Sequence, residues 1–164
     1  MNKLSLDRRA AVLSALVEGS SIRATSRMTG ASKGAILRLV VEVGEFCSVY
    51  QDHTLRNLPC HRVEADEIWS FCYAKERNVS PAAPEGTGDL WTFTAICADT
   101  KLAVSWLVGE RTPANATAFM ADVAARLAHR VQLTTDGQSM YLSAVETAFG
   151  WNGVDYAQIG RAHV

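Results

Sequence analysis

Two aspartates, Asp66 and Asp136, are the residues of this sequence best suited to hold a divalent metal ion. Asp66 lies in residues 63–73, where apolar and polar side chains alternate, and this pattern predicts a half-buried β-strand. An acidic group in mid-strand needs water, a cation or a hydrogen-bond partner, because its unpaired burial is very unfavourable. Asp136 ends the run 131–136 and could supply a second carboxylate. The first stretch is therefore either an edge strand with a solvated face or a metal-binding strand.

Two glutamates flank Asp66 in the same stretch. Glu64 shares the face of Asp66, so we expect it to be solvated or to support the site from outside. Strand alternation turns Glu67 to the opposite face, so we do not expect it at the site. The sequence thus predicts a site of two aspartates.

Composition places the chain among ordinary globular proteins. Of its 164 residues, 48% are hydrophobic and 20% are charged. No stretch approaches the roughly 20 apolar residues of a membrane span, and no signal peptide is recognisable, so a cytoplasmic location is expected. The cysteines form no Cys-x-x-Cys pair, which favours structural thiols over a zinc site; they are Cys47, Cys60, Cys72 and Cys97.

Charge is distributed unevenly along the chain. Residues 1–40 contain seven Lys or Arg and two Asp or Glu, a net charge of +5, whereas residues 61–164 contain eight basic and twelve acidic residues, a net charge of −4. A basic N-terminal part suggests a nucleic-acid partner, and an acidic remainder suggests cations.

The first 43 residues contain a pattern typical of a helix-turn-helix. Helices are expected over 7–18, with Ala10, Leu13, Leu16 and Val17 on one face, over 22–28, and from Ser32 to about Val43. A small residue, Ser26, precedes Gly30, which permits a tight turn. On such a unit the candidate DNA-contacting residues are Arg23, Arg27, Lys33, Leu37 and Arg38. The alternative is an ordinary three-helix bundle with solvated basic residues.

The remaining chain predicts strands first and then alternating helices and strands. After the strand at 63–73, a long Pro- and Gly-containing loop leads to strands at 90–98 and 102–108, an antiparallel meander. Thr112-Pro113 begins a helix that extends to about His129. A strand at 131–134, a helix at 139–149 facing inward with Tyr141, Leu142, Val145 and Phe149, and a strand from Val154 follow.

The predicted fold class is mixed α/β (or α+β), a helix-turn-helix followed by a ribonuclease H-like domain. This domain has a three-strand antiparallel meander followed by α-β-α-β. In that architecture the fourth strand lies beside the first, so Asp66 and Asp136 are expected to meet. The expected parts are residues 1–45 (DNA-binding unit), 46–60 (connector), 61–158 (catalytic domain, incomplete at its C-terminus) and 159–164 (non-native tail).

A set of short motifs extends from about Arg8 to Gln158. The motifs are Asp66-Glu67-Ile68-Trp69-Ser70-Phe71, Tyr73-Ala74-Lys75-x-x-Asn78, Trp91-Thr92, Asp99-Thr100-Lys101, Ala116-Thr117-Ala118-Phe119-Met120, Gln132-Leu133-Thr134-Thr135-Asp136-Gly137 and Val154-Asp155-Tyr156-Ala157. With these motifs the chain resembles the insertion-sequence-one family of bacterial transposases, a branch of the enzymes that have an Asp-Asp-Glu triad.

This resemblance implies an activity, a cofactor and partners. Asp66 would be the first catalytic acid and Asp136 the second, and both would bind Mg²⁺ or Mn²⁺. Two ions roughly 3.5–4 Å apart can stabilise the entering and leaving oxygens of a phosphodiester displacement. The implied partner is double-stranded DNA, both element ends and target, without a membrane, in the bacterial cytoplasm. The complete protein could act as a homo-oligomer.

Two features depart from the family pattern. The family's third acid is a glutamate on a later helix; Glu146 comes too soon after Asp136 to take that role, so we expect a C-terminally truncated chain with little or no strand-transfer activity. The family's cysteine zinc ribbon does not precede the helices. Residues 159–164 match the translation of a common sequencing adapter, which predicts a non-native tail; a natural tail is the alternative.

Three functions follow from these expectations. The first is a transposase fragment that binds terminal inverted repeats through residues 7–43. The second is a non-catalytic DNA-binding protein, such as a repressor of element ends. The third is a stand-alone nuclease of the same fold, without specificity for element ends.

Overall fold

The computed structural model describes residues 3–150 and 152–160. Over these residues it contains five α-helices and one five-stranded mixed sheet. The chain divides into two compact units, Met1–Thr54 and Leu55–Val164. The first unit is helical and the second contains the sheet, so the predicted mixed α/β class is confirmed.

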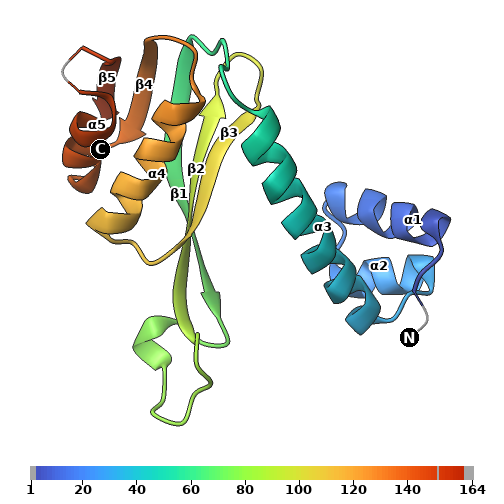
Figure 1. Cartoon of the computed structure of the whole chain (residues 1–164). Helices are drawn as coiled ribbons and strands as arrows, with labels where there is room; N and C mark the ends of the chain where they lie inside the picture. The colour runs from blue at the N-terminus through green and yellow to red at the C-terminus, as the bar shows by residue number, and fades with distance from the viewer. Residues whose placement is uncertain (1–2, 151, 161–164) are drawn as a thin grey trace. The chain divides into compact units, whose positions relative to one another are not determined.

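The first unit consists of α1 (Leu6–Val17), α2 (Ile22–Thr29) and α3 (Lys33–Thr54), as Figure 1 shows. Serine side chains cap the start of each helix: the Oγ atoms of Ser5, Ser21 and Ser32 accept backbone N–H groups of the first turns. Gly30 ends α2 with a left-handed φ of 67°. This conformation suits glycine, and it turns the chain sharply into α3.

The core of the helical unit differs in part from the sequence-based expectation. Its buried apolar residues are Val12, Ala31, Ile36 and Leu39, with Leu13 and Leu16 packed against them. Ala10 and Val17, which were expected on the buried face, are exposed. The expected and the observed buried faces of α1 share Leu13 and Leu16. The observed apolar stripe is rotated by one residue, so that Val12 enters the core.

Helix α3 continues to Thr54, well past the predicted end near Val43. The expected connector at 46–60 is therefore largely helical. No proline lies between residues 33 and 58, and Gly44, the one glycine of the helix beyond Val43, is tolerated at a cost of about 1 kcal/mol. Residues 45–50 are all exposed, yet Phe46, Val49 and Tyr50 among them have the i, i+3, i+4 spacing of one helical face.

The second unit is built on a sheet with strand order β3-β2-β1-β4-β5. The bounds are β1 (Arg62–Cys72), β2 (Gly88–Cys97), β3 (Ala103–Gly109), β4 (Val131–Asp136) and β5 (Val154–Ile159). The first three strands form the predicted antiparallel meander, and β4 and β5 add in parallel. The predicted order of strands and helices is thus observed.

Two helices, α4 (Pro113–Arg126) and α5 (Met140–Phe149), pack against each other on one face of the sheet (Figure 1). Thr112 caps α4, and Pro113 occupies its first turn, as predicted. The core between helices and sheet includes Phe93, Phe119, Met120, Leu133 and Tyr141, all fully buried. Leu142, which was expected to face inward, is 54% exposed, because the buried face of α5 is formed by Tyr141, Ala144 and Val145.

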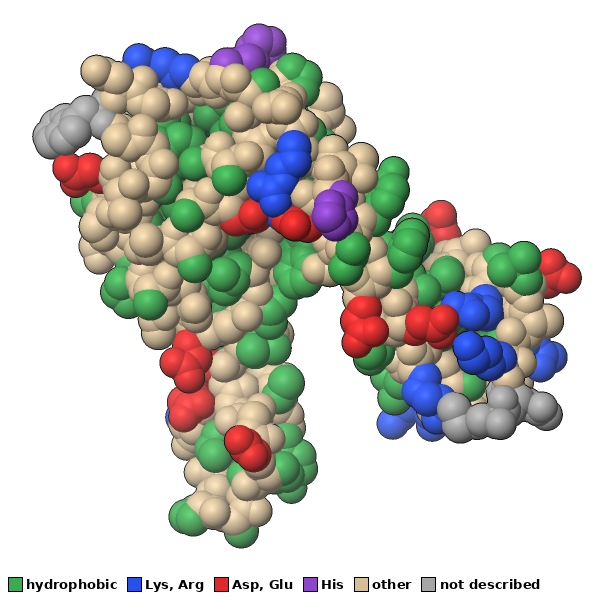
Figure 2. Space-filling model, viewed as in Figure 1, with side chains coloured by type: hydrophobic (Ala, Val, Ile, Leu, Met, Phe, Trp, Pro, Cys, Tyr) green, Lys and Arg blue, Asp and Glu red, His purple; other side chains and the backbone are tan. Residues whose placement is uncertain are grey.

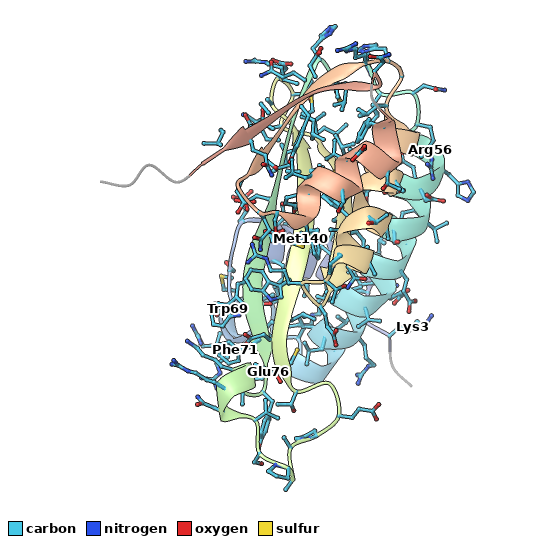
Figure 3. All side chains as sticks on the ribbon, turned by 90° about the vertical axis from the view of Figure 1, so that its left-hand side faces the viewer. Lys3, Arg56, Trp69, Phe71, Glu76 and Met140 are labelled. Atoms are coloured by element: carbon cyan, nitrogen blue, oxygen red, sulfur yellow. The ribbon has the colours of Figure 1, made fainter. Side chains whose placement is uncertain are left out.

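Strands β1 and β2 continue as a two-stranded ribbon beyond the rest of the sheet (Figure 1). The pairing reaches Cys72 and Gly88, and the loop between them contains a short 3₁₀ helix, Glu76–Asn78. Trp69 and Phe71 lie on this ribbon above Glu76 (Figure 3), and the ammonium group of Lys75 lies 4.8 Å from the ring centre of Trp69.

At the end of the sheet, β5 includes Ile159, which pairs with Asp136. The predicted tail at 159–164 therefore begins inside this strand, and its residues 161–164 lie outside the described residues. None of the helices that the structure describes combines the length and the apolar character needed to cross a membrane.

Candidate metal centre

The parallel pairing of β1 with β4 brings Asp66 and Asp136 together. The last paired residues are Ala65 and Thr135, so the two aspartates follow at neighbouring positions where β4 ends. Val63 and Leu133, fully buried two residues earlier, anchor this register in the core. A shift of one residue would expose these apolar groups, so packing fixes the position of the acids.

Oxygen atoms of Asp66, Glu67 and Asp136 lie within 4.8 Å of one another. Asp66 Oδ1 accepts the backbone N–H of Glu67 at 2.7 Å, and Asp136 Oδ1 accepts that of Gln138 at 3.1 Å. Each aspartate has a second oxygen for a ligand. Carboxylate oxygens are the donors that hard cations such as Mg²⁺ prefer, and Ca²⁺ binds them at roughly 2.3–2.6 Å. The donor set therefore fits a divalent ion, although acidic groups also cluster on protein surfaces without one.

Glu67 is the member of this cluster that sequence reasoning missed. Strand alternation does turn it toward the helix-covered face, where its side chain is only 1% exposed. Its carboxylate nevertheless reaches the two aspartates, because alternation fixes the direction of Cβ but not the end of a long side chain at a strand's edge. The expectation that Glu67 lies away from the site is therefore wrong.

The charge partner of Glu67 is Arg111, from the segment between β3 and α4. Arg111 Nη2 lies 2.9 Å from Glu67 Oε2 and 4.0 Å from Asp136 Oδ2. The guanidinium carbon lies 4.5 Å from the ring centre of Trp91. With the Gln138 amide oriented so that its oxygen faces Arg111, that oxygen accepts from Nη1 and Nη2 at 3.1 and 3.2 Å. A cation is thus held beside the three carboxylates.

Behind the acids, two buried oxygens lack a hydrogen-bond partner of ordinary geometry within the described part of the chain. They are Glu67 Oε1 and the hydroxyl of Tyr141 on α5. Burial raises the pKa of Tyr141 well above its usual range, and the nearby charge of Glu67 raises it further. Tyr141 is therefore a neutral hydroxyl facing a carboxylate, not an additional anion.

On the other face of the sheet, Asp66 and Asp136 line a pocket of about 540 Å³. Glu64, Thr94 and Thr134 also contribute to its wall. Glu64 is exposed, as expected from its place beside Asp66 on the strand. Glu146 lies exposed on α5 and is not part of the acidic cluster. A ligand larger than an ion therefore has space next to the two aspartates.

No protein-family model and no curated protein matches the chain. Among solved structures, similarity is found to "Crystal structure of the Mos1 Strand Transfer Complex" (13% identity, TM-score 0.40, 95% of this chain and 59% of that chain). It is also found to "Mos1 transposase paired-end complex with left transposon end" (12%, 0.41, 95% and 60%) and "Crystal structure of a pre-cleavage Mos1 transpososome" (13%, 0.37, 96% and 60%). These similarities alone establish no shared function. The chain spans about three fifths of each matched chain.

The candidate DNA-contacting residues lie in the helical unit, and all are exposed. Arg23 and Arg27 belong to α2, and Lys33, Leu37 and Arg38 belong to the first part of α3. Figure 2 shows Lys and Arg side chains gathered on this unit. The structure therefore leaves these residues accessible to a partner.

The cysteines divide into two exposed thiols, Cys47 and Cys72, and two buried ones, Cys60 and Cys97. Burial and a hydrogen bond with Cys97 raise the pKa of Cys60 to about 11. Neither buried cysteine belongs to a group of potential metal ligands within the described residues. The expectation of structural thiols therefore agrees with the position of this pair.

Proposed function

We propose that the chain is a transposase-type protein of a bacterial insertion sequence, with one DNA-binding unit and one metal-dependent unit. The observation that carries the proposal is the meeting of Asp66 and Asp136 at the end of β4, across a parallel pairing of distant segments. The order of strands supports assignment of the second unit as ribonuclease H-like. In this proposal the activity of the complete protein is DNA cleavage and strand transfer.

In the proposed site, Asp66 and Asp136 hold Mg²⁺ or Mn²⁺. The ion would supply positive charge to the entering and leaving oxygens of a phosphodiester and to its non-bridging oxygens. The protein's part is to hold the two carboxylates in place through backbone hydrogen bonds and buried neighbours. The pocket beside them would admit the DNA backbone.

In the helical unit, we propose that α2, the Gly30 turn and α3 form a helix-turn-helix. Lys33, Leu37 and Arg38 would face the major groove, and Arg23 and Arg27 would contact phosphates. Exposure of all five residues and the net charge of +5 over residues 1–40 support this assignment. The bound sequence would be the terminal inverted repeats of the element.

The first test is metal binding by the full chain. We expect the electron paramagnetic resonance signal of free Mn²⁺ to fall when wild-type protein is added, and Asp66→Asn or Asp136→Asn to weaken binding by about tenfold or more, since a metal site loses a charged ligand. Asp155→Asn, an exposed aspartate paired with Arg130, is the matched control and should bind as wild type does. Equal binding by all four proteins would refute the proposed site.

A non-catalytic DNA-binding protein is the second candidate, favoured by the exposed basic residues of α2 and α3. Asp66→Ala distinguishes the two functions. In both cases DNA binding survives the substitution. In a chain restored to full length, only a transposase-type protein has metal-dependent cleavage to lose, measured on labelled duplex DNA. Wild-type protein that binds DNA and does not bind Mn²⁺ would favour the second candidate.

A further inference from the structure

We propose that Arg111 binds a phosphate group of DNA held at Asp66 and Asp136, and that Glu67 positions Arg111 for this contact. This inference rests on the proposed function of the two aspartates. The alternative is that Arg111 serves only as the counter-ion of a buried glutamate. Three features of the site favour a role beyond that of a counter-ion.

The first feature is the number of donors that Arg111 keeps available. A guanidinium has five N–H donors. Glu67 Oε2 takes one from Nη2, and the Gln138 amide oxygen takes one each from Nη1 and Nη2. One donor on Nη1 and the Nε donor have no described partner. Because the side chain is 30% exposed, an incoming oxyanion can reach it.

The second feature is the fixed position of the guanidinium. The guanidinium carbon lies over the Trp91 ring, while Glu67 and Gln138 bind its N–H groups. Arginine recognises phosphate through a planar array of donors, and a guanidinium that is already ordered loses less conformational entropy on binding. The buried carboxylate of Glu67 thus orients a cation that is itself partly open to solvent.

The third feature is the charge balance of the site. A divalent ion neutralises Asp66 and Asp136, and Arg111 neutralises Glu67. Without Arg111, the same site with one ion would carry a net negative charge and repel the phosphodiester that it has to bind. Arg111 does not line the pocket, but its Nη2 lies 4.0 Å from Asp136 Oδ2, so its positive charge acts on a phosphate bound at the two aspartates.

The test measures how much Ca²⁺ strengthens binding of a fluorescein-labelled DNA duplex to the full chain. Fluorescence anisotropy gives Kd with and without Ca²⁺ at constant ionic strength, and the ratio of interest is Kd without Ca²⁺ divided by Kd with Ca²⁺. Dividing this ratio by the same ratio for the Asp66→Asn/Asp136→Asn protein gives a corrected ratio, free of effects of Ca²⁺ outside the site. We expect Arg111→Gln to lower the corrected ratio by about tenfold, as for loss of a charge-assisted hydrogen bond. Arg111→Lys should keep part of the corrected ratio, and the matched control Arg130→Gln should leave it unchanged.

Glu67 is tested as a positioning residue through non-additivity. If Glu67 acts through Arg111, Glu67→Gln lowers the ratio in the wild-type background and has no further effect in the Arg111→Gln background. The double variant also leaves no unpaired buried charge, so it keeps the test valid if Arg111→Gln alone fails to fold. Thermal unfolding of each variant identifies the folded ones.

The outcomes separate this inference from the proposed function. A corrected ratio that is unchanged in Arg111→Gln and in the double variant overturns the role of Arg111 and leaves the metal centre standing. Wild-type protein that binds Mn²⁺ through Asp66 and Asp136 but shows no Ca²⁺-dependent gain for DNA also overturns it. Absence of Mn²⁺ binding removes the proposed function itself, and the inference with it.

Discussion

Asp122 and Arg126 form a partly buried ion pair one turn apart on α4. Arg126 is only 7% exposed, and its Nε lies 2.6 Å from Asp122 Oδ2, which also accepts the hydroxyl of Ser105. Burial by itself would raise the pKa of Asp122, but the hydrogen bonds from Arg126 and Ser105 outweigh it and hold the pKa below its ordinary value. This pair ties α4 to β3.

We expect Asp122→Ala to lower the free energy of unfolding by about 1–3 kcal/mol at neutral pH, because buried donors lose their acceptor. The folded pKa is depressed, so the stabilisation is present above the unfolded value near 3.9 and is lost as pH falls through the folded value. The difference between wild type and variant should therefore shrink in acid, measured by urea unfolding across pH. Asp155→Ala removes an exposed pair and should change stability much less; an equal loss in both variants would contradict the prediction.

The metal centre shows what residue types and spacing can and cannot reveal. Asp66 and Asp136 were predicted to meet, and they do, because the strands that carry them have clear apolar patterns. Glu67 was excluded on alternation alone. Its pairing with Arg111, 44 residues away, depends on side-chain conformations that no local pattern encodes. The ligand and DNA-contacting roles of these residues stay predictions.

At the scale of elements, the Gly30 turn sets how α2 leads into α3. Its φ of 67° is unfavourable for any residue with a Cβ, whereas Gly34, the second residue of α3, has ordinary helical geometry and is exposed. The two glycines therefore allow the same substitution to be compared in opposite conformations.

We expect Gly30→Ala to destabilise the protein by about 1 kcal/mol and Gly34→Ala to stabilise it by about 0.5–1 kcal/mol. Neither added Cβ meets an atom closer than 3.6 Å, so the difference reports backbone conformation and not a clash. Thermal unfolding followed by circular dichroism measures both. Stabilisation by both substitutions would contradict the left-handed turn.

Element order was predictable because its signals are local. Thr112-Pro113 marks the start of α4, and alternation marks β1. The end of α3 was missed although Phe46, Val49 and Tyr50 have helical spacing, because Gly44 precedes them and they are exposed and not part of the core. Similarly, Leu142 looked like a core residue on an apolar helix, but α5 buries only one narrow face against α4.

At the scale of the whole molecule, the helical unit carries seven basic and five acidic residues, whereas the sheet unit carries nine basic and twelve acidic residues. If Arg23 and Arg27 contact DNA phosphates, each contact releases counter-ions. The logarithm of the binding constant then falls with the logarithm of salt concentration, with a slope of about −0.9 per contact.

We expect Arg27→Ala to make that slope shallower by about 1, because one phosphate contact is lost, measured by anisotropy over a range of NaCl concentrations. Arg130→Ala in the sheet unit is the control and should leave the slope of metal-free binding unchanged. The same reduction in both variants would mean that binding follows net charge and does not depend on the helical unit.

The seam between β1 and β4 closes a loop of roughly 70 residues, with the meander and α4 inside it. In the unfolded chain the two aspartates are far apart, so they do not form a chelating pair that could bind a divalent ion. An ion that binds at this seam would select the native state alone. By mass action it would add about 2.7 kcal/mol to stability at a free concentration one hundred times its Kd. Folding would then be coupled to the supply of the cofactor.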